Sequence, residues 1–228
     1  MEINPQETIE LEQNLRAPGL NHRRIALDKL AKYPPEIAVP ILKKLLIEPD
    51  IGLRRLAIMG LGNHRSMEAF DALQGVLVGA GDSSIMAEAA NSIFEFGDTA
   101  IPILQQLFSR STNWLVRQTI ISLLVETDQY QVLLDTLIIA LDDETQTVQE
   151  AGVLALGRLL KSPLETEALA RLSQLAIDPD WRIRWRTAIA LSGSDAPLAR
   201  QLTARLQQDE HFRVVAAALE GVGIGDRD

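Results

Sequence analysis

All three tryptophans of this 228-residue chain lie close to arginines. Trp114 precedes Arg117 by three residues, and Trp181 precedes Arg184 by the same interval. The second pair is surrounded by three more residues of the same two types: Arg182, Trp185 and Arg186. A guanidinium pairs with a carboxylate through two parallel hydrogen bonds, and a tryptophan ring stacks on flat or cationic groups. These residues therefore suit recognition of a partner that presents carboxylates beside planar groups.

The same residues also have a purely structural interpretation. A tryptophan directly after a helix N-cap can staple the helix to the preceding turn. An arginine that recurs at one position of successive repeats can pair with a capping aspartate or a carbonyl of the adjacent repeat. Arg182 and Arg186 would then lie on a solvated helix face. Both interpretations stay open, and the candidate contacts for a partner or its ligand are Trp114, Arg117, Trp181, Arg182, Arg184, Trp185 and Arg186.

Other chemistry finds little support. The chain has no cysteine, which excludes disulfides, thiolate metal ligands and thioether-attached cofactors. Its three histidines, His22, His64 and His211, are far apart, and none is followed by the glutamate of the His-Glu dipeptides through which some di-iron hydroxylases bind metal. We expect no metal site, and no conventional catalytic motif or catalytic residue can be assigned.

A repeat of about 31 residues runs through the chain. Its register positions are Arg23, Arg54, Met86, Arg117, Gln149, Arg184 and Arg213, with steps of 31, 32, 31, 32, 35 and 29 residues. Residues one before, four after and seven after these positions are mostly apolar and share one face of a helix. Four residues before the register positions lie candidate N-caps: Gly19, Asp50, Asp82, Asn113, Thr145, Asp180 and Asp209.

Each capped helix follows another segment with helical apolar periodicity, so the repeat unit is a pair of helices. A unit of this length is typical of tetratricopeptide or HEAT repeats, and the tryptophan, glycine and tyrosine pattern of the former is absent. The sequence predicts an all-α protein: a right-handed α-solenoid of about seven HEAT-like two-helix repeats, forming a single domain over residues 1–228.

The charge balance bears on the partners. Five of the seven register positions are arginines, which would form a basic stripe like that of HEAT-like DNA glycosylases. Met86 and Gln149 interrupt this stripe, acidic caps lie one turn away, and the net charge is −9. We therefore expect no nucleic-acid partner. The chain opens without a signal-peptide pattern and has no apolar run long enough to cross a bilayer, so we expect a cytoplasmic protein without membrane insertion.

Several runs resemble a known family beyond the repeat class. They are YPPEIAVPILKKLL, TNWLVRQTIISLL, VLLDTLIIALDDETQTVQEAGVLALGRL and DPDWRIRWRTAIAL. The chain resembles the cyanobacterial HEAT-like proteins named for phycobilisome lyases, and within them the phycobilisome-degradation (NblB-type) branch. The resemblance implies an αβ phycobiliprotein as partner and its bilin, bound transiently, as ligand. No covalently bound cofactor is implied, because the bilin-accepting cysteine belongs to the phycobiliprotein.

The sequence thus predicts a protein that binds a phycobiliprotein on its concave face and acts in bilin handling or phycobilisome degradation. A bilin lyase-type activity is compatible with this prediction. The alternative is a non-catalytic interaction scaffold or assembly factor for another photosynthetic complex. A change in the visible spectrum on mixing would separate the two, because a scaffold need not disturb the chromophore.

Overall fold

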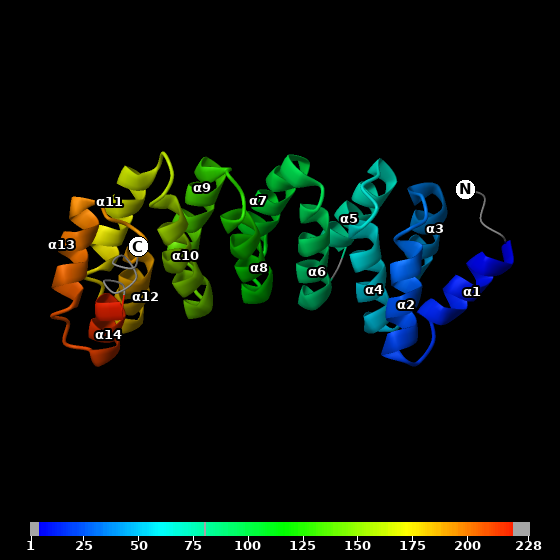
Figure 1. Ribbon diagram of the computed structural model, residues 1–228, viewed down its shortest axis with the longest axis horizontal. Helices are drawn as coiled ribbons and strands as arrows, with labels where there is room; N and C mark the ends of the chain where they lie inside the picture. Colours follow the sequence, from blue (N-terminus) through cyan, green and yellow to red (C-terminus); the bar gives the residue numbers. More distant parts are fainter. Residues whose placement is uncertain (1–4, 80, 221–228) are drawn as a thin grey trace, which may run out of the picture. The chain divides into compact units, whose positions relative to one another are not determined.

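The computed structural model describes residues 5–79 and 81–220, and these form fourteen α-helices and one short 3₁₀ helix, without any strand. Consecutive helices pair through short turns, as the two-helix repeat predicts (Figure 1). The helices are α1 (Pro5–Leu15), α2 (Leu20–Leu30), α3 (Pro35–Leu45), α4 (Ile51–Gly62), α5 (Met67–Gly79), α6 (Ser83–Phe94), η1 (Gly97–Ala100), α7 (Ile101–Arg110), α8 (Trp114–Val125), α9 (Tyr130–Leu141), α10 (Gln146–Leu159), α11 (Glu165–Leu175), α12 (Trp181–Leu191), α13 (Pro197–Leu206) and α14 (Phe212–Glu220).

The chain divides into two compact units, residues 1–107 and 108–228. Within each unit the second helices of successive repeats pack closely on one another: α4 on α6 in the first, and α8, α10, α12 and α14 in sequence in the second. The first helices, such as α11 and α13, touch each other far less. Closer spacing in one row of helices curves a solenoid toward that row, so the second helices line the inner side of each unit. A single domain over 1–228 stays a prediction.

The predicted apolar face of the second helices is the core of each repeat. Seven residues after the register position, every side chain from the first six repeats is buried: Leu30, Leu61, Ile93, Leu124, Leu156 and Leu191. Residues with this spacing share one helix face, and burying that face against the first helix and the neighbouring repeat drives folding. The apolar pattern therefore fixes both the helix pairing and the stacking.

Aspartate and asparagine caps begin most of the second helices. The side chains of Asp50, Asp82, Asn113 and Asp180 accept hydrogen bonds from backbone amides of the first turn, as the sequence predicts. These bonds satisfy amides that have no partner inside the helix. The predicted caps Gly19 and Thr145 also precede their helices but make no side-chain capping bond.

In the seventh repeat the predicted register is wrong by two residues. Helix α14 begins at Phe212, so His211 stands at the capping position and Asp209 does not. The carbonyl of His211 accepts from the amide of Val215, and its Nδ1 accepts from the amide of Arg213 at 3.3 Å. Val215 therefore takes the register position, 31 residues after Arg184. The carboxylate of Asp209 instead binds Arg184 of the previous repeat.

Buried arginines connect consecutive repeats. The side chain of Arg184 donates from Nη1 to the carbonyl of Asp178 at 2.8 Å, which closes its own turn. Its Nε and Nη2 donate to the carboxylate of Asp209 in the next repeat at 2.7 and 3.0 Å. This guanidinium holds the pKa of Asp209 below its usual range. We call such a contact a cross-repeat arginine bridge.

The bridge recurs in other repeats with the same spacing. Arg23 donates to a carbonyl six residues earlier and to Asp50, the cap of the next second helix. Arg117 donates to a carbonyl six residues earlier and to Asp143 in the next repeat. Gln149 keeps only the first half of the pattern, because its amide reaches the carbonyl of Asp143. Arg23, Arg117 and Arg184 therefore pair with aspartates of the next repeat, as the structural interpretation of these arginines predicts.

Two glycines let neighbouring second helices approach closely. A Cβ on Gly157 of α10 would lie 3.0 Å from the carbonyl oxygen of Ala190 and 3.3 Å from its Cα, in α12. A Cβ on Gly62 of α4 would lie 3.2 Å from the Cα of Ser92 in α6. Both glycines lie eight residues after their register positions. The missing side chain thus sets the helix spacing at the same point in two repeats.

Removing a cross-repeat arginine bridge should destabilise the protein. Arg184→Ala leaves Asp209, whose side chain is 8% exposed, without its cation, so we expect the free energy of unfolding to fall by about 3 kcal/mol. The control is Arg65→Ala, because Arg65 pairs with Glu95 while its side chain is 71% exposed, and the expected loss is below about 1 kcal/mol. Urea unfolding followed by circular dichroism measures both, and equal losses would contradict a structural role for the bridge.

A methyl group at Gly157 should push two helices apart. Gly157→Ala places its Cβ against the backbone of Ala190, and we expect a loss of about 1–2 kcal/mol in unfolding free energy. Gly75→Ala is the matched control, since nothing lies within 4 Å of its Cβ and the helix α5 should gain about 0.5–1 kcal/mol. Opposite shifts in melting temperature are expected, and stabilisation by both substitutions would refute the close approach.

Candidate functional site

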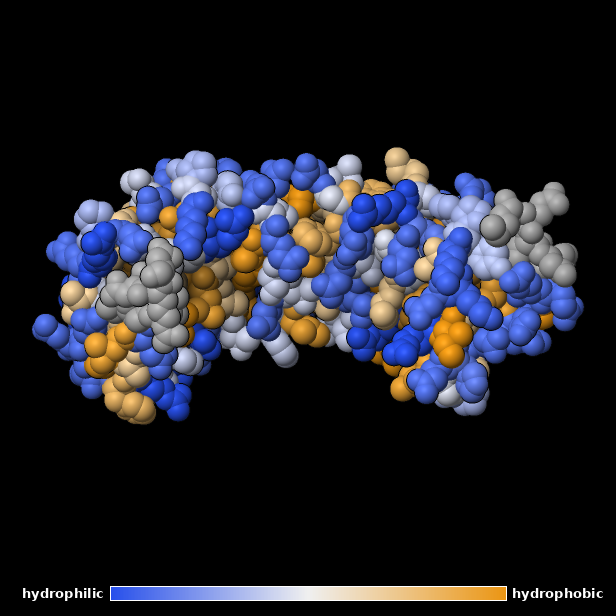
Figure 2. Space-filling view, viewed as in Figure 1, coloured by the Kyte–Doolittle hydropathy of each residue, from blue (hydrophilic) through white to orange (hydrophobic). Residues whose placement is uncertain are grey.

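The structure brings four of the seven candidate residues together with three others. Trp181, Arg182, Trp185 and Arg186 lie in the first turns of α12, and the start of α14 packs beside them. We call the resulting group the α12–α14 cluster: Trp181, Arg182, Trp185, Arg186, His211, Phe212 and Arg213. Hydrophobic surface is visible over the start of α14 at the lower left of Figure 2.

The rings of the α12–α14 cluster form a short stack. The imidazole of His211 lies parallel to the indole of Trp181, with centroids 3.9 Å apart and planes inclined by 8°. The ring of Phe212 follows at 5.1 Å from His211 and 22°. The ring of Trp185 is tilted against that of Trp181, with centroids 6.2 Å apart and planes inclined by 34°. Four rings from two repeats therefore make one continuous aromatic surface.

Guanidiniums cover the faces of these rings. Arg182 lies 4.8 Å and Arg213 lies 5.6 Å from the ring centroid of Trp181, and Arg186 lies 4.1 Å from that of Trp185. At these distances a cation is attracted by the negative face of the ring. These contacts place the three arginine side chains along the aromatic surface.

The three guanidiniums differ in their carboxylate partners. Arg186 donates from Nε to Glu150 of α10 at 2.9 Å. Within the described parts of the chain, Arg182 forms its ion pair with Asp180, at 3.7 Å, and that carboxylate also caps α12. Arg213 has no carboxylate within ion-pair distance among the described residues. Among the described residues, Arg182 and Arg213 therefore lack the close carboxylate partner that Arg186 has.

The remaining three candidates lie outside this cluster or beneath it. Arg184 and Arg117 point into their cross-repeat bridges, with side chains 10% and 16% exposed. Trp114, at the start of α8, is 47% exposed, and α10 packs between α8 and α12. A partner contact at these positions stays a prediction, while their packing and ion pairs within the chain are features of the structure.

Sequence reasoning missed His211, Phe212 and Arg213. The uncorrected register put Phe212 in an apolar column that is buried in the second to sixth repeats, yet its side chain is 73% exposed. In the corrected register Phe212 is the first residue of its second helix, as Trp114 and Trp181 are of theirs. The 31-residue step from Arg184 to Val215 was the signal that could have found it.

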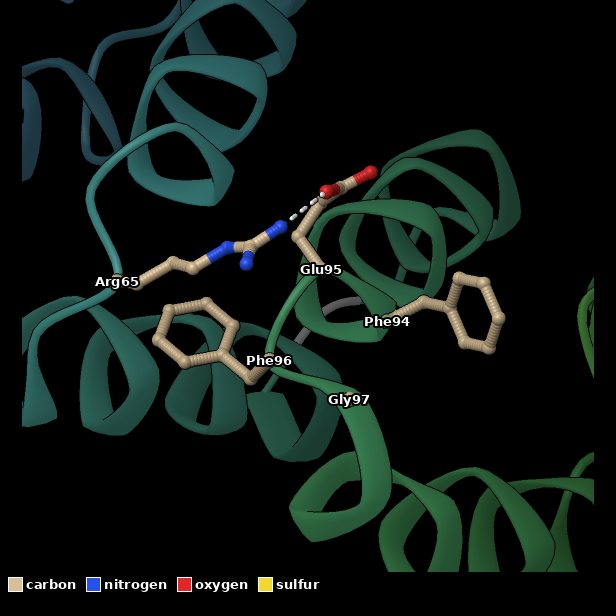
Figure 3. A pocket seen from close by; sticks show the side chains of 5 residues that line it. All are labelled: Arg65, Phe94, Glu95, Phe96 and Gly97. Carbon is tan, nitrogen blue, oxygen red and sulfur yellow. Dashed lines mark hydrogen bonds and ion pairs between the residues drawn. The ribbon is translucent and has the colours of Figure 1, made fainter. Parts of the chain in front are cut away.

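A surface depression lies in the first unit, between the α4–α5 turn and the end of α6. It has a volume of about 530 Å³ and is lined by Arg65, Phe94, Glu95, Phe96 and Gly97. In Figure 3 the side chain of Arg65 extends over the ring of Phe96 toward Glu95, and Phe94 points away. Arg65 and Glu95 pair with each other at 3.3 Å, so the depression offers little unpaired charge to a ligand.

The part of the chain that the structure describes contains no candidate metal site and no helix that could span a membrane. No group of three histidine, cysteine, aspartate or glutamate side chains there is arranged to hold a metal ion. None of the described helices is both long enough and apolar enough to cross a lipid bilayer. The three histidines lie in separate repeats: His22 is exposed, His64 is buried and His211 belongs to the α12–α14 cluster.

Buried His64 should make the protein sensitive to mild acid. Its Nε2 has no hydrogen-bond partner among the described residues, and burial lowers its pKa below the usual 6.5. The unfolded chain then binds the proton more readily than the folded one, so unfolding free energy should fall as pH drops below about 6.5. His64→Leu should flatten this dependence between pH 7.5 and 5.5, whereas exposed His22→Leu should keep it. Unfolding curves at several pH values test this, and an unchanged slope in His64→Leu would contradict it.

Comparison with known proteins agrees with the architecture. The HEAT repeats family matches residues 39–125 and 134–223, which is more than half of the chain. No relative was found among curated proteins. A karyopherin, Kap121p, bound to the extreme C-terminus of the phosphatase Cdc14p matches at a TM-score of 0.56 and 15% identity, over 98% of this chain and 30% of that one. A homology model of the AP-3 complex matches at 0.61 and 20% identity, over 97% and 44%.

A third likeness is to the complex of CpcE and CpcF of phycocyanin lyase from Nostoc, at a TM-score of 0.48 and 20% identity, covering 100% of this chain and 90% of that one. The chain spans less than half the length of the karyopherin and AP-3 chains, and at these identities the likenesses show the fold alone. The repeat register, the helix pairing and the family match agree, and the chain belongs to the HEAT-repeat family.

Proposed function

We propose that this protein binds a phycobiliprotein and acts in bilin handling or phycobilisome degradation, as a relative of the NblB-type proteins. The observation that carries the proposal is the α12–α14 cluster, where four rings and three guanidiniums share one surface. Tryptophan and arginine are the residues that most often dominate protein–protein binding energy. The sequence runs that resemble the phycobilisome family give the partner its identity.

The cluster has the chemistry that a bilin or its binding protein would require. The pyrrole plane of a bilin would stack on an exposed aromatic face, and its propionates would pair with guanidinium donors. Phe212, whose side chain is 73% exposed, and Arg213 supply one group of each kind at adjacent positions. Binding an αβ protomer there would loosen the chromophore site, and the bilin would be held transiently without a covalent bond.

An interaction scaffold for another photosynthetic complex is the second candidate. The cross-repeat bridges favour this candidate. Arg117 and Arg184 donate their hydrogen bonds to carbonyls and carboxylates of the chain itself, so these donors stabilise the solenoid and do not contact a ligand. A repeat protein used in this way supplies an extended surface for a partner and performs no chemistry on it.

The test is size-exclusion chromatography of the protein with purified phycocyanin or allophycocyanin at about 10 μM, with the visible spectrum recorded across the peak. Co-elution with a shifted or bleached bilin band is expected. Trp181→Ala should weaken the complex at least tenfold, whereas the control Ile47→Ala should not, although Ile47 is 87% exposed. Separate elution would leave only binding weaker than about −7 kcal/mol and would favour the scaffold.

A further inference from the structure

The imidazole of His211 caps helix α14 and supports the aromatic surface at the same time. Its Nδ1 accepts a hydrogen bond from the backbone amide of Arg213 at 3.3 Å, and its ring stacks on Trp181 with centroids 3.9 Å apart. A neutral imidazole has one nitrogen that accepts and one that donates, whereas both nitrogens of the protonated ring donate. The bond to the amide of Arg213 therefore exists only while Nδ1 carries no proton.

The other side-chain caps do not depend on a proton in this way. Four second helices are capped by a carboxylate or an amide, namely those that follow Asp50, Asp82, Asn113 and Asp180. An amide does not titrate, and a carboxylate stays ionised well below the range in which a histidine changes charge. Of these five caps, only that of α14 responds to pH between about 5 and 8.

Charged groups surround His211 on the elements that pack beside it. They are Asp209 and Glu210 in the preceding turn, Arg182 and Arg184 in α12, Arg205 in α13 and Arg213 in α14. Both oxygens of Asp209 already bind Arg184. Glu210 is 88% exposed, so its attraction for a charged ring is screened by solvent. Arg213 lies 5.6 Å from the ring of Trp181, and a positive charge on His211 would repel it.

Protonation leaves the neighbours of the capping bond in place. A cation is attracted by the face of an indole, so the charged ring keeps its stack on Trp181. The carbonyl of His211 still accepts from the amides of Val214 and Val215, because these bonds do not involve the ring. The change is therefore confined to the two residues between, Phe212 and Arg213.

We propose that His211 is a proton-sensitive cap, which fixes Phe212 and Arg213 beside the ring of Trp181 at neutral pH and releases them in mild acid. The device is a property of this chain alone and goes beyond the proposed function. Where a partner covers the α12–α14 cluster, the same proton should weaken its binding.

The test follows the backbone amides of the isotope-labelled full chain by two-dimensional NMR between about pH 8 and 5.5, with hydrogen exchange corrected for the intrinsic effect of pH. Protection of the Arg213 amide should fall about fivefold, with the same midpoint as the ring protons of His211. The matched control is the amide of Leu115, which bonds to the side chain of Asn113 at 3.0 Å and should keep its protection.

Two variants separate the cap from a general effect of acid. His211→Asn offers an acceptor that does not titrate, so the Arg213 amide should stay protected throughout the range. His64→Leu removes the buried histidine of the first unit and should leave the response of Arg213 unchanged. Circular dichroism verifies that each variant is folded.

The possible outcomes decide the inference without any partner. Constant protection of the Arg213 amide while the ring of His211 titrates would overturn it, and so would an equal fall in His211→Asn or at Leu115. Failure to bind phycocyanin would refute the proposed function alone, because that complex takes no part in these measurements. A fall that is confined to Arg213 and Phe212 and absent from His211→Asn would support the cap.

Discussion

A guanidinium that leaves water must find partners for its donors inside the protein, and this constraint organises the turns of the solenoid. Arg184 meets it by closing its own turn through a carbonyl and reaching an aspartate of the next repeat. Arg23 and Arg117 do the same with Asp50 and Asp143. Each bridge needs the neighbouring turn at a fixed distance and orientation. These polar contacts at the turns therefore fix how consecutive repeats are aligned with each other. The hydrophobic core supplies most of the buried area but little directional specificity.

The helix pairing could be predicted from the sequence because the pattern repeats six times with little variation. An apolar side chain such as Leu61 or Leu124 is buried wherever the helix face is buried, and periodicity alone reports that face. The register predicted for the seventh repeat was wrong by two residues, and the reason is physical. Asp209 has the residue type of an N-cap, but its carboxylate binds Arg184 and the amide of His211 instead. Residue type alone cannot distinguish these uses of one aspartate.

Part of the candidate site could also be predicted from the spacing of residues along a helix. Trp181, Arg182, Trp185 and Arg186 are neighbours on one helix, so their proximity follows from sequence spacing. The contribution of α14 depends on packing between repeats, because a shift of two residues turns Phe212 from a core residue into a surface one. Arg117 and Arg184 match the candidate pattern by type, and only their buried carboxylate partners show that their donors are used within the fold.

One carboxylate connects the inside of this protein to its aromatic surface. Asp209 binds the buried guanidinium of Arg184 and also the amide of His211, whose ring supports Trp181 and Phe212. The rings are therefore anchored to a buried ion pair that joins two repeats. A surface held in this way has little side-chain conformational entropy left to lose when it is covered. Preorganisation of this kind lets a modest contact area bind with useful affinity, since less of the interaction energy is consumed in ordering the surface.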